Sequence, residues 1–460
     1  MSKNYDIKDT IISISSGFNK SAIAIIRMSG DDCFEIASKF IKPTKSFKNI
    51  KPDSTLKLSV YDENDELIDR VIAIPYIEPK SYTGENMLEI FCHGSTYIVK
   101  KIINTAIKYS ARQAYNGEFS FRAFLNGKID LSQAEAINDL INSETKKQHE
   151  IAIRQLSGNI KSKINSIKEN LIELLSEIEV RIDDNYEEME KLDYDKFQKK
   201  LSNIINECEK FAKSFESGKY LKSGVKIAIT GLPNSGKSSL LNTLVGYNRA
   251  IVSQKPGTTR DTIEETIEIN GYKVIINDTA GINLASEDEI EKEGIERSRD
   301  AIKKADIIIF LIDISQKADM ENEKIEREII ENKRSDSTLI KVFSKSDLKP
   351  KIEIPDNSLK ISSLTNENID RLKEIIISNI ESKNFDSGEI LTSIRHYKCL
   401  NESLVYLNET KKIICSNQKE EIELIAENLR SALNSLVDIV GETTSEDILH
   451  KIFSDFCVGK

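Results

Sequence analysis

The sequence predicts a multi-domain protein that combines an α/β part, an all-α part and an inserted third domain, and three observations support this. Residues 1–121 alternate short β-like apolar runs with helical stretches, a pattern typical of a compact α/β domain. Between 131 and 215 the apolar residues recur at helical spacing. A glycine-rich motif at 231–238 then follows a short apolar run, and a second helical region closes the chain.

The α/β part is expected to contain strands and helices in alternation. The predicted strands are Ile11–Ser15, Ala22–Met28, Val71–Ile77 and Met87–Cys92, and the predicted helices are Asp31–Ile41 and Thr96–Tyr109.

The helical part is predicted to bury one apolar stripe and to accept an insertion. The stripe consists of Leu171, Leu174, Leu175, Ile178 and Ile182. Ser217–Gly224 is small and polar and is interpreted as a hinge. We therefore predict an α/β domain at 1–121, a helical domain at 122–218 that resumes at 383–460, and an inserted domain at 219–382. A long coiled coil is the alternative, which the stripe disfavours because it does not keep heptads for long.

The most informative motif is Gly231-Leu-Pro-Asn-Ser-Gly-Lys-Ser238, a full match to G-x-x-x-x-G-K-[ST]. It lies between the strand-like run 225–230 and the helix-like run 239–245. In this context the glycines let backbone N–H groups converge on a phosphate, Lys237 reaches the β and γ oxygens, and Ser238 binds Mg²⁺. The motif predicts a nucleotide held by its phosphates.

Two further segments are predicted to respond to the γ-phosphate. Pro256-Gly-Thr-Thr-Arg-Asp261 offers Thr259 as a second Mg²⁺ ligand, and Asp278-Thr-Ala-Gly281 follows a β-rich run. In Ser344-Lys-Ser-Asp347, the Asp347 carboxylate can accept two hydrogen bonds from guanine, a pattern that adenine does not offer, so an ATPase or kinase is disfavoured. The predicted GTP-binding residues are Asn234, Ser235, Gly236, Lys237, Ser238, Ser239, Ser253, Gln254, Lys255, Pro256, Gly257, Thr258, Thr259, Asp278, Thr279, Ala280, Gly281, Ser344, Lys345, Asp347, Ser362, Ser363 and Leu364.

Two positions depart from common GTPase patterns. Ser344 stands where N-K-x-D has asparagine, which removes an amide that would brace the base. Ile282 stands where small signalling GTPases place a water-orienting glutamine, so hydrolysis must use another residue or ion. The acidic stretch Ser286–Glu291 supplies candidates, each of which taken alone is more often solvated surface.

Composition excludes several classes of protein. The chain has 460 residues and a net charge of −10 with Lys and Glu interspersed, which disfavours a strongly basic nucleic-acid surface. Its six cysteines show no C-x-x-C spacing, and no secretory or transit signal is evident, so a cytoplasmic location is expected. No apolar run approaches the roughly 18 residues of a membrane span.

Motifs along the whole chain resemble the tRNA-modification GTPase family called MnmE or TrmE. Besides the phosphate loop and the Gly257–Asp261 segment, they include Tyr82-Thr-Gly-Glu85, the run from Gly117 to Ala136, and the terminal Cys457-Val-Gly-Lys460. The C-x-G-K terminus is the most specific of these, because many GTPases share the others. The resemblance implies an N-terminal folate-binding domain, a helical domain and an inserted P-loop domain of Ras-like fold.

The family resemblance also implies chemistry and partners. It implies a homodimer joined through its N-terminal domains, a tetrahydrofolate derivative (5-formyl or methylene) as one-carbon donor, and an FAD-dependent partner protein in a heterotetramer. Together they would install an aminomethyl or carboxymethylaminomethyl group at C5 of the wobble uridine of certain tRNAs. The residues that match the family's folate site are Arg27, Glu85, Lys128 and Lys460. Cys457 is implied to be catalytic.

The resemblance further implies K⁺ activation, with the ion framed by Asn234, Ser253, Lys255 and Thr258. A cation there can offset charge that develops between the phosphates. Glu291 aligns with the family's water-positioning acid, so it joins Lys237 as a catalytic candidate. Near the start of the chain, Ser15–Ala22 replaces the family's Pro-Pro-Gly-Arg-Gly-Gly-like loop.

Two other functions compete with this interpretation. A GTPase switch in ribosome assembly would usually carry a basic RNA-binding domain, which the acidic helical C-terminus disfavours. A scaffold with an inactive GTPase domain is disfavoured by the intact Lys237, Ser238, Thr259 and Asp278.

The tail is predicted to form a helix capped by Thr444–Asp447. This helix would bury Ile448, Ile452, Phe453 and Phe456 and would thereby hold Cys457 and Lys460 in a fixed place.

Overall fold

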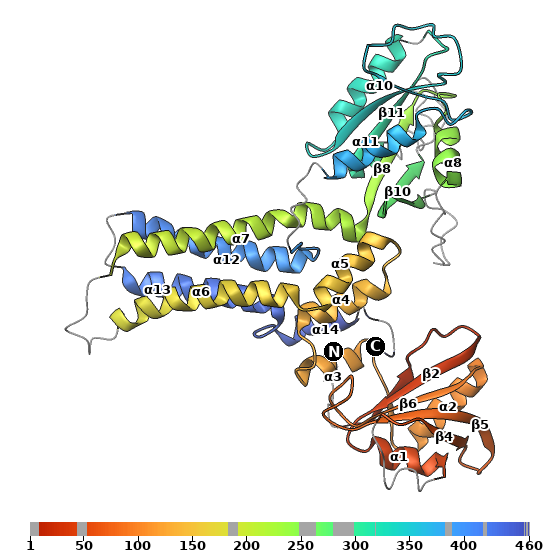
Figure 1. Ribbon diagram of the computed structural model, residues 1–460, viewed down its shortest axis with the longest axis vertical. Coiled ribbons are helices and arrows are strands. Elements are labelled where there is room, and N and C mark those ends of the chain that lie inside the picture. Colours follow the sequence, from red (N-terminus) through yellow and green to blue (C-terminus); the bar gives the residue numbers. More distant parts are fainter. Residues whose placement is uncertain are drawn as a thin grey trace. The chain divides into compact units, whose positions relative to one another are not determined.

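The computed structural model describes residues 9–43, 53–182, 192–247, 264–278, 299–317, 319–381, 389–416, 421–454, 456 and 459 (Figure 1). The chain divides into two compact units. The first comprises 1–138, 155–164 and 437–460, and the second comprises 139–154 and 165–436. In the part of the chain that the structure describes, no helix combines the length and hydropathy of a membrane span.

The first unit is built on a mostly antiparallel sheet with strand order β3-β4-β5-β6-β2-β1-β7. Its strands are β1 (Ile11–Ile14), β2 (Ser21–Ser29), β3 (Ile41–Lys42), β4 (Leu56–Tyr61), β5 (Leu67–Tyr76), β6 (Met87–Gly94) and β7 (Arg112–Gln113). Helices α1 (Cys33–Phe40) and α2 (Thr96–Lys108) pack on one face, where alternate strand residues form the core. The four predicted strands and both helices are confirmed. Strand β4 was not predicted, although Leu56, Leu58 and Val60 alternate with Lys57 and Ser59 as in a half-buried strand.

A small helical cluster completes this unit. It contains α3 (Glu118–Leu125), α4 (Leu131–Ile141) and α14 (Glu446–Ser454), which pack around Phe121, Leu131 and Phe453. The α14 helix was predicted, but two details were wrong. Thr444 donates its hydroxyl to the carbonyl of Asp438 instead of capping the helix, and Leu449 is buried while Ile448 is 44% exposed.

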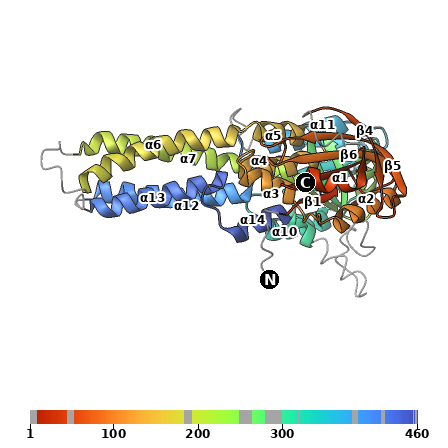
Figure 2. The ribbon, with the colours of Figure 1, turned by 90° about the horizontal axis from the view of Figure 1, so that it is seen from below.

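The second unit contains four long helices that lie side by side in both views (Figures 1 and 2). They are α6 (Asn159–Ile182), α7 (Tyr194–Ser223), α12 (Ile394–Cys415) and α13 (Ile422–Val440), and α5 (Lys146–Leu156) precedes them. The predicted stripe is confirmed at Leu171, Leu174, Leu175 and Ile178, which are buried. The apolar stripe therefore faces the other helices, as its spacing requires.

The predicted hinge at Ser217–Gly224 is wrong. Helix α7 continues through Ser223 and ends only at Gly224, whose φ of 81° is unfavourable for other residues. A Cβ at Gly218 would lie 1.8 Å from the carbonyl oxygen of Leu391. Gly218 therefore permits close packing against the segment around Leu391. Its small size serves this contact and does not provide the flexibility of a hinge.

The inserted domain is a sheet with strand order β13-β12-β11-β8-β10-β9, parallel except for β9. Its strands are β8 (Val225–Gly231), β9 (Glu264–Ile269), β10 (Tyr272–Asp278), β11 (Ile307–Asp313), β12 (Thr338–Ser344) and β13 (Leu359–Ile361). Helices α8 (Lys237–Tyr247), α10 (Asp319–Asn332) and α11 (Ile369–Glu381) accompany it. The predicted Asn270-Gly271 hairpin is confirmed, with φ of 50° and 86° at the two turn residues.

Candidate functional site

The glycine-rich motif forms a loop between the end of β8 and the start of α8. Gly231 has a φ of 152°, and a Cβ there would lie 2.4 Å from the carbonyl oxygen of Leu311. Asn234 and Gly236 also have positive φ, of 62° and 97°. A Cβ on Gly236 would meet nothing within 4 Å, so the loop has open space beside the start of α8. This backbone fits a phosphate at a helix N-terminus.

Lys237 is buried and bends back over this loop. Its ammonium donates to the carbonyls of Gly231, at 3.1 Å, and Leu232, at 2.7 Å. The cation is thus held at the loop in a place where a phosphate can meet it. Ser238 and Ser239 are exposed on the first turn of α8, and the buried Ser235 hydroxyl finds no partner among the described residues.

Ser344 links the strand that precedes the predicted base-binding motif to the phosphate loop. Its buried hydroxyl donates to the carbonyl of Ser235 at 2.7 Å, with the carbonyl of Ile312 at 3.3 Å. Sequence reasoning treated this serine as the loss of an amide. The structure shows that the hydroxyl makes a specific contact with the loop.

The predicted guanine-binding residues gather at the carboxyl ends of β12 and β13. The Asp347 carboxylate accepts from the Ser362 hydroxyl at 2.5 Å, which orients it. Lys345 forms an ion pair of 2.6 Å with Asp313 at the end of β11. The carbonyl of Ser363 accepts from Thr243 of α8 at 3.3 Å, and Leu364 is exposed.

Several predicted residues lie outside the described part of the chain. They are Ser253, Gln254, Lys255, Pro256, Gly257, Thr258, Thr259, Thr279, Ala280, Gly281, Ile282, Glu291, Cys457 and Lys460. Asp278 ends β10, where its backbone is in register with Ile229 of β8. The Mg²⁺ ligand Thr259, three of the four K⁺ residues and the catalytic role of Glu291 therefore stay predictions.

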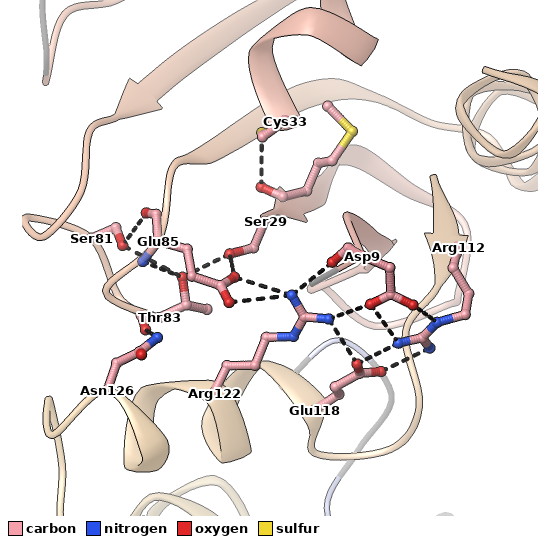
Figure 3. A network of polar contacts seen from close by, with 11 residues as sticks. Asp9, Ser29, Cys33, Ser81, Thr83, Glu85, Arg112, Glu118, Arg122 and Asn126 are labelled. Atoms are coloured by element: carbon pink, nitrogen blue, oxygen red, sulfur yellow. Dashed lines mark hydrogen bonds and ion pairs between the residues drawn. The ribbon is translucent and has the colours of Figure 1, made fainter. Parts of the chain in front are cut away.

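The first unit holds a second polar site, around Glu85 in the loop before β6 (Figure 3). The Glu85 carboxylate accepts from Ser29 at 2.7 Å and from Arg122 at 3.2 and 3.3 Å. Ser29 also shares a 2.7 Å hydrogen bond with Thr83, while the Ser81 hydroxyl donates to the Glu85 carbonyl at 2.6 Å. Glu85 is therefore held in one orientation at the edge of a buried network.

Arg122 is almost fully buried and connects Glu85 to two other carboxylates. It donates to Asp9 at 2.7 Å and to Glu118 at 3.1 Å. Arg112 binds the same two carboxylates, at 2.5 Å to Asp9 and 2.6 Å to Glu118. Burial raises the pKa of Asp9, but hydrogen bonds and charge from Arg112 and Arg122 outweigh burial and leave this pKa below its usual value. We call Asp9, Glu85, Arg112, Glu118 and Arg122 the carboxylate–arginine network.

The structure brings three of the four folate candidates together. Arg27 lies two residues before Ser29 on β2, so both side chains leave the same face of the strand. Arg27 pairs with Glu89 at 2.7 Å and lies 4.9 Å from the centre of the Tyr82 ring. The Lys128 side chain lies beside the loop that contains Glu85. Its Cγ and Cδ would be 3.4 Å from a Cβ placed on Gly84. The Lys128 ammonium donates to the carbonyl of Pro79 at 2.8 Å.

The tail of the chain meets this unit at the end of β1. Ser15 donates its hydroxyl to the carbonyl of Gly459 at 3.0 Å. Gly459 has a φ of 91°, and a Cβ there would lie 1.8 Å from the carbonyl oxygen of Ile14. Phe456 is buried in the cluster around Phe453. The tail is therefore docked through Phe456 and Gly459.

Sequence reasoning missed most of the carboxylate–arginine network, and it also missed Ser29, which donates to Glu85. Asp9, Ser29, Arg112, Glu118 and Arg122 were not candidates, although Glu118 and Arg122 lie in a motif that carried the resemblance. Only the i, i+4 spacing of Glu118 and Arg122 on a helix could have signalled a pair.

Comparisons with known proteins cover both sites. The family model described as GTP-binding protein TrmE N-terminus matches residues 10–128, and the model described as MnmE helical domain matches 131–457. Proteins named tRNA modification GTPase MnmE match almost the whole chain. The one from Christiangramia forsetii is 38% identical over 99% of this chain and 100% of its own length. The one from Clostridioides difficile is 37% identical over the same shares of the two chains.

One solved structure, of Era from Aquifex aeolicus bound to GDP and AlF₄⁻, is 25% identical over 39% of this chain and 66% of its own. Its TM-score is only 0.28, so the family assignment rests on the sequence relatives.

Proposed function

The chain belongs to the MnmE family of tRNA modification GTPases, and we propose that it modifies C5 of the wobble uridine of certain tRNAs in a reaction that requires GTP hydrolysis. It is a GTPase with a P-loop domain between the two halves of a helical domain. The observation that carries the proposal is the coexistence of two pre-organised sites, the phosphate loop around Lys237 and the network around Glu85.

The residues of the phosphate loop fit a guanine nucleotide. The open space at Gly236, the cation of Lys237 and the oriented carboxylate of Asp347 match phosphates at one end and a base at the other. Ser238 and Thr259 would hold Mg²⁺, which supplies charge stabilisation when it is bound. Glu291 would then orient the attacking water, since Ile282 has no polar atom to do so.

The residues around Glu85 fit a tetrahydrofolate derivative of the 5-formyl or methylene type. Glu85 can accept hydrogen bonds from the amino-pyrimidinone edge, and Arg27, Lys128 and Lys460 can bind the carboxylates of the glutamyl tail. The folate would supply one carbon when it is bound. Cys457 would take part in the transfer, and the docking of Gly459 supports a fixed position for the residues beside it.

A homodimer is proposed to form through the α/β domain, in the cytoplasm. The sheet face opposite α1 and α2 carries Ile72, Phe91 and Ile25 in one line across β5, β6 and β2, with Ile23 exposed beside them. An apolar face of this kind suits a second copy of the chain. An FAD-dependent partner would join two such chains in a heterotetramer that acts on tRNA.

The K⁺ proposal has a direct test in the purified protein. Asn234 is exposed at the phosphate loop with positive φ, and Ser253, Lys255 and Thr258 would complete the ion site. We expect GTP hydrolysis to be slow in Na⁺ and to rise markedly in K⁺, because a K⁺ ion can offset charge between the β- and γ-phosphates. Equal rates in the two salts at matched ionic strength would remove the K⁺ assignment.

The modification itself is tested by nucleoside analysis of tRNA. We expect a strain without this gene to lack the C5 group on the wobble uridine, and the intact gene to restore it. A normal wobble uridine in the strain without the gene, with no related gene present, would contradict the proposed function.

A further inference from the structure

The second unit contains a joint where four segments of the chain meet. The chain enters the inserted domain at the end of α7 and leaves it at the end of α11. The tip of the β9–β10 hairpin and the region around the start of α5 meet these two ends. We call this meeting place the hairpin joint and define it by Glu144, Lys147, Gly271, Tyr272, Lys273 and Glu381.

The hairpin tip touches α5 through the backbone. The N–H of Lys147 donates to the carbonyl of Gly271 at 3.3 Å. A Cβ on Gly271 would lie 3.1 Å from the Cγ of Lys147, so glycine leaves room for this approach as well as for the positive φ of the turn.

Three side chains then close the contact. The ammonium of Lys147 lies 3.7 Å from the centre of the Tyr272 ring and 3.2 Å from the Glu381 carboxylate. The Tyr272 hydroxyl donates to the same carboxylate at 3.1 Å. Burial raises the pKa of Tyr272, and Glu381 raises it further, so the phenol keeps its proton and remains a donor. One cation, one ring and one carboxylate therefore join α5, β10 and α11.

The flanks of the joint are tied by further contacts. Lys273 pairs with Glu144 at 2.5 Å, and Lys222 at the end of α7 pairs with Asp139 of α4 at 2.8 Å. Gln148 donates to the carbonyl of Lys222 at 2.8 Å.

The same hairpin leads to both segments predicted to respond to the γ-phosphate. Strand β10 ends at Asp278, next to 279–281, and β9 begins at Glu264, soon after 256–261. Strand β10 also pairs with β8, which ends at the phosphate loop. The ladder of paired residues from Glu264–Asn277 to Ile269–Tyr272 thus connects the nucleotide end of the hairpin to its tip.

We propose that the hairpin joint transmits the nucleotide state of the inserted domain to α4 and α5 of the helical region, with Lys147 and Tyr272 as its positioning residues. The two states are the nucleotide-free and GTP-bound arrangements of the β9–β10 hairpin, and α5 senses their difference because its N-terminus holds the tip. The inference needs only GTP binding and is independent of the folate and wobble-uridine proposals.

The test is hydrogen–deuterium exchange of the full chain with and without a non-hydrolysable GTP analogue. In the unaltered protein, we expect the analogue to change exchange of residues 139–154 by at least about threefold. Lys147→Ala is expected to abolish this change while the affinity for the analogue stays within about threefold. Lys146→Ala is the matched control. The Lys146 side chain, next to Lys147 in the sequence, is 79% exposed, and among the described residues it pairs only with Glu150, at 3.8 Å. It should respond like the unaltered protein.

A charge reversal provides a second test that does not depend on Lys147. Lys273→Glu places a carboxylate against Glu144 and should weaken the response, whereas Lys273→Glu with Glu144→Lys should restore it. Three results would overturn the proposal: no response of 139–154 in the unaltered protein, a full response in Lys147→Ala, or a more than tenfold loss of analogue affinity in Lys147→Ala. The last result would place the joint in the nucleotide site itself.

Discussion

The phosphate loop and the carboxylate–arginine network hold buried charge in opposite ways. The loop centres on one cation, Lys237, whose ammonium is held by backbone carbonyls within eight consecutive residues. The network contains three carboxylates and two guanidinium groups, from residues spread between Asp9 and Arg122. The loop is thus suited to bind an anion, and the network is suited to bind a hydrogen-bond donor or a cation. The comparison shows that one chain can pre-organise two sites for ligand groups of opposite charge, one from a contiguous motif and one from residues distant in the sequence.

The largest expected effect comes from breaking the network at its centre. Arg122→Ala leaves Glu85, Asp9 and Glu118 with one guanidinium in place of two, so we expect the α/β part to lose about 3–5 kcal/mol of unfolding free energy. The loss is measurable as a urea-dependent rise in hydrogen exchange of residues 11–29. Arg327→Ala is the control, since its single exposed pair with Glu323 is 3.5 Å long and should contribute about 0–1 kcal/mol. Equal effects of the two changes would show that the network does not stabilise the fold.

The second effect concerns the loop. Lys237→Ala removes the cation that meets the phosphates, so kcat for GTP hydrolysis should fall by about 10²–10³-fold. Lys226→Ala, on an exposed position of β8, should hydrolyse GTP normally. Stability of the α/β part should not change in either variant. A rate near normal in Lys237→Ala would refute the role given to this lysine.

A smaller effect is expected at Ser344, which joins the loop to β12. Ser344→Ala removes the 2.7 Å hydrogen bond to the carbonyl of Ser235, worth about 0.5–1.5 kcal/mol, so affinity for GTP should fall about two- to tenfold. The sequence predicts that Ser344→Asn binds GTP as well or better. Weaker binding by Ser344→Asn, measured by calorimetry, would show that the serine is specifically fitted to this loop.

The smallest effect is the pH dependence that Asp9 gives to the network. Its pKa is lowered in the folded protein from 3.8, so its stabilising contribution is present above pH 3.8 and disappears as pH falls through the lower folded value. The unfolding free energy of Asp9→Asn should therefore be lower than normal at pH 6, and the two proteins should converge only as pH falls below 3.8 and through the lower folded pKa. A constant gap between the two proteins across this range would contradict the assignment.

The two sites also differ in how much of them the sequence predicts. The loop, its flanking strand and helix and the Asn270-Gly271 hairpin follow from local motifs, because each residue acts on neighbours close in the chain. The network needed tertiary structure, since Asp9 meets Arg122 across most of the α/β domain. The mistaken hinge has the same origin, because Gly218 is explained by its contact with Leu391 and not by its neighbours in sequence. The domain boundaries at 121, 218 and 382 stay predictions.

The separation of the two sites is the central claim, and Glu85→Gln tests it most directly. The amide keeps the shape of the side chain but removes the carboxylate that would accept the donor edge of the folate. In one preparation, with the partner protein, folate and tRNA present, GTP hydrolysis and wobble-uridine modification should be measured together. In that preparation, the account predicts GTP hydrolysis by the variant within about threefold of normal, together with loss of modification. Full modification by the variant, or a parallel collapse of hydrolysis, would contradict it.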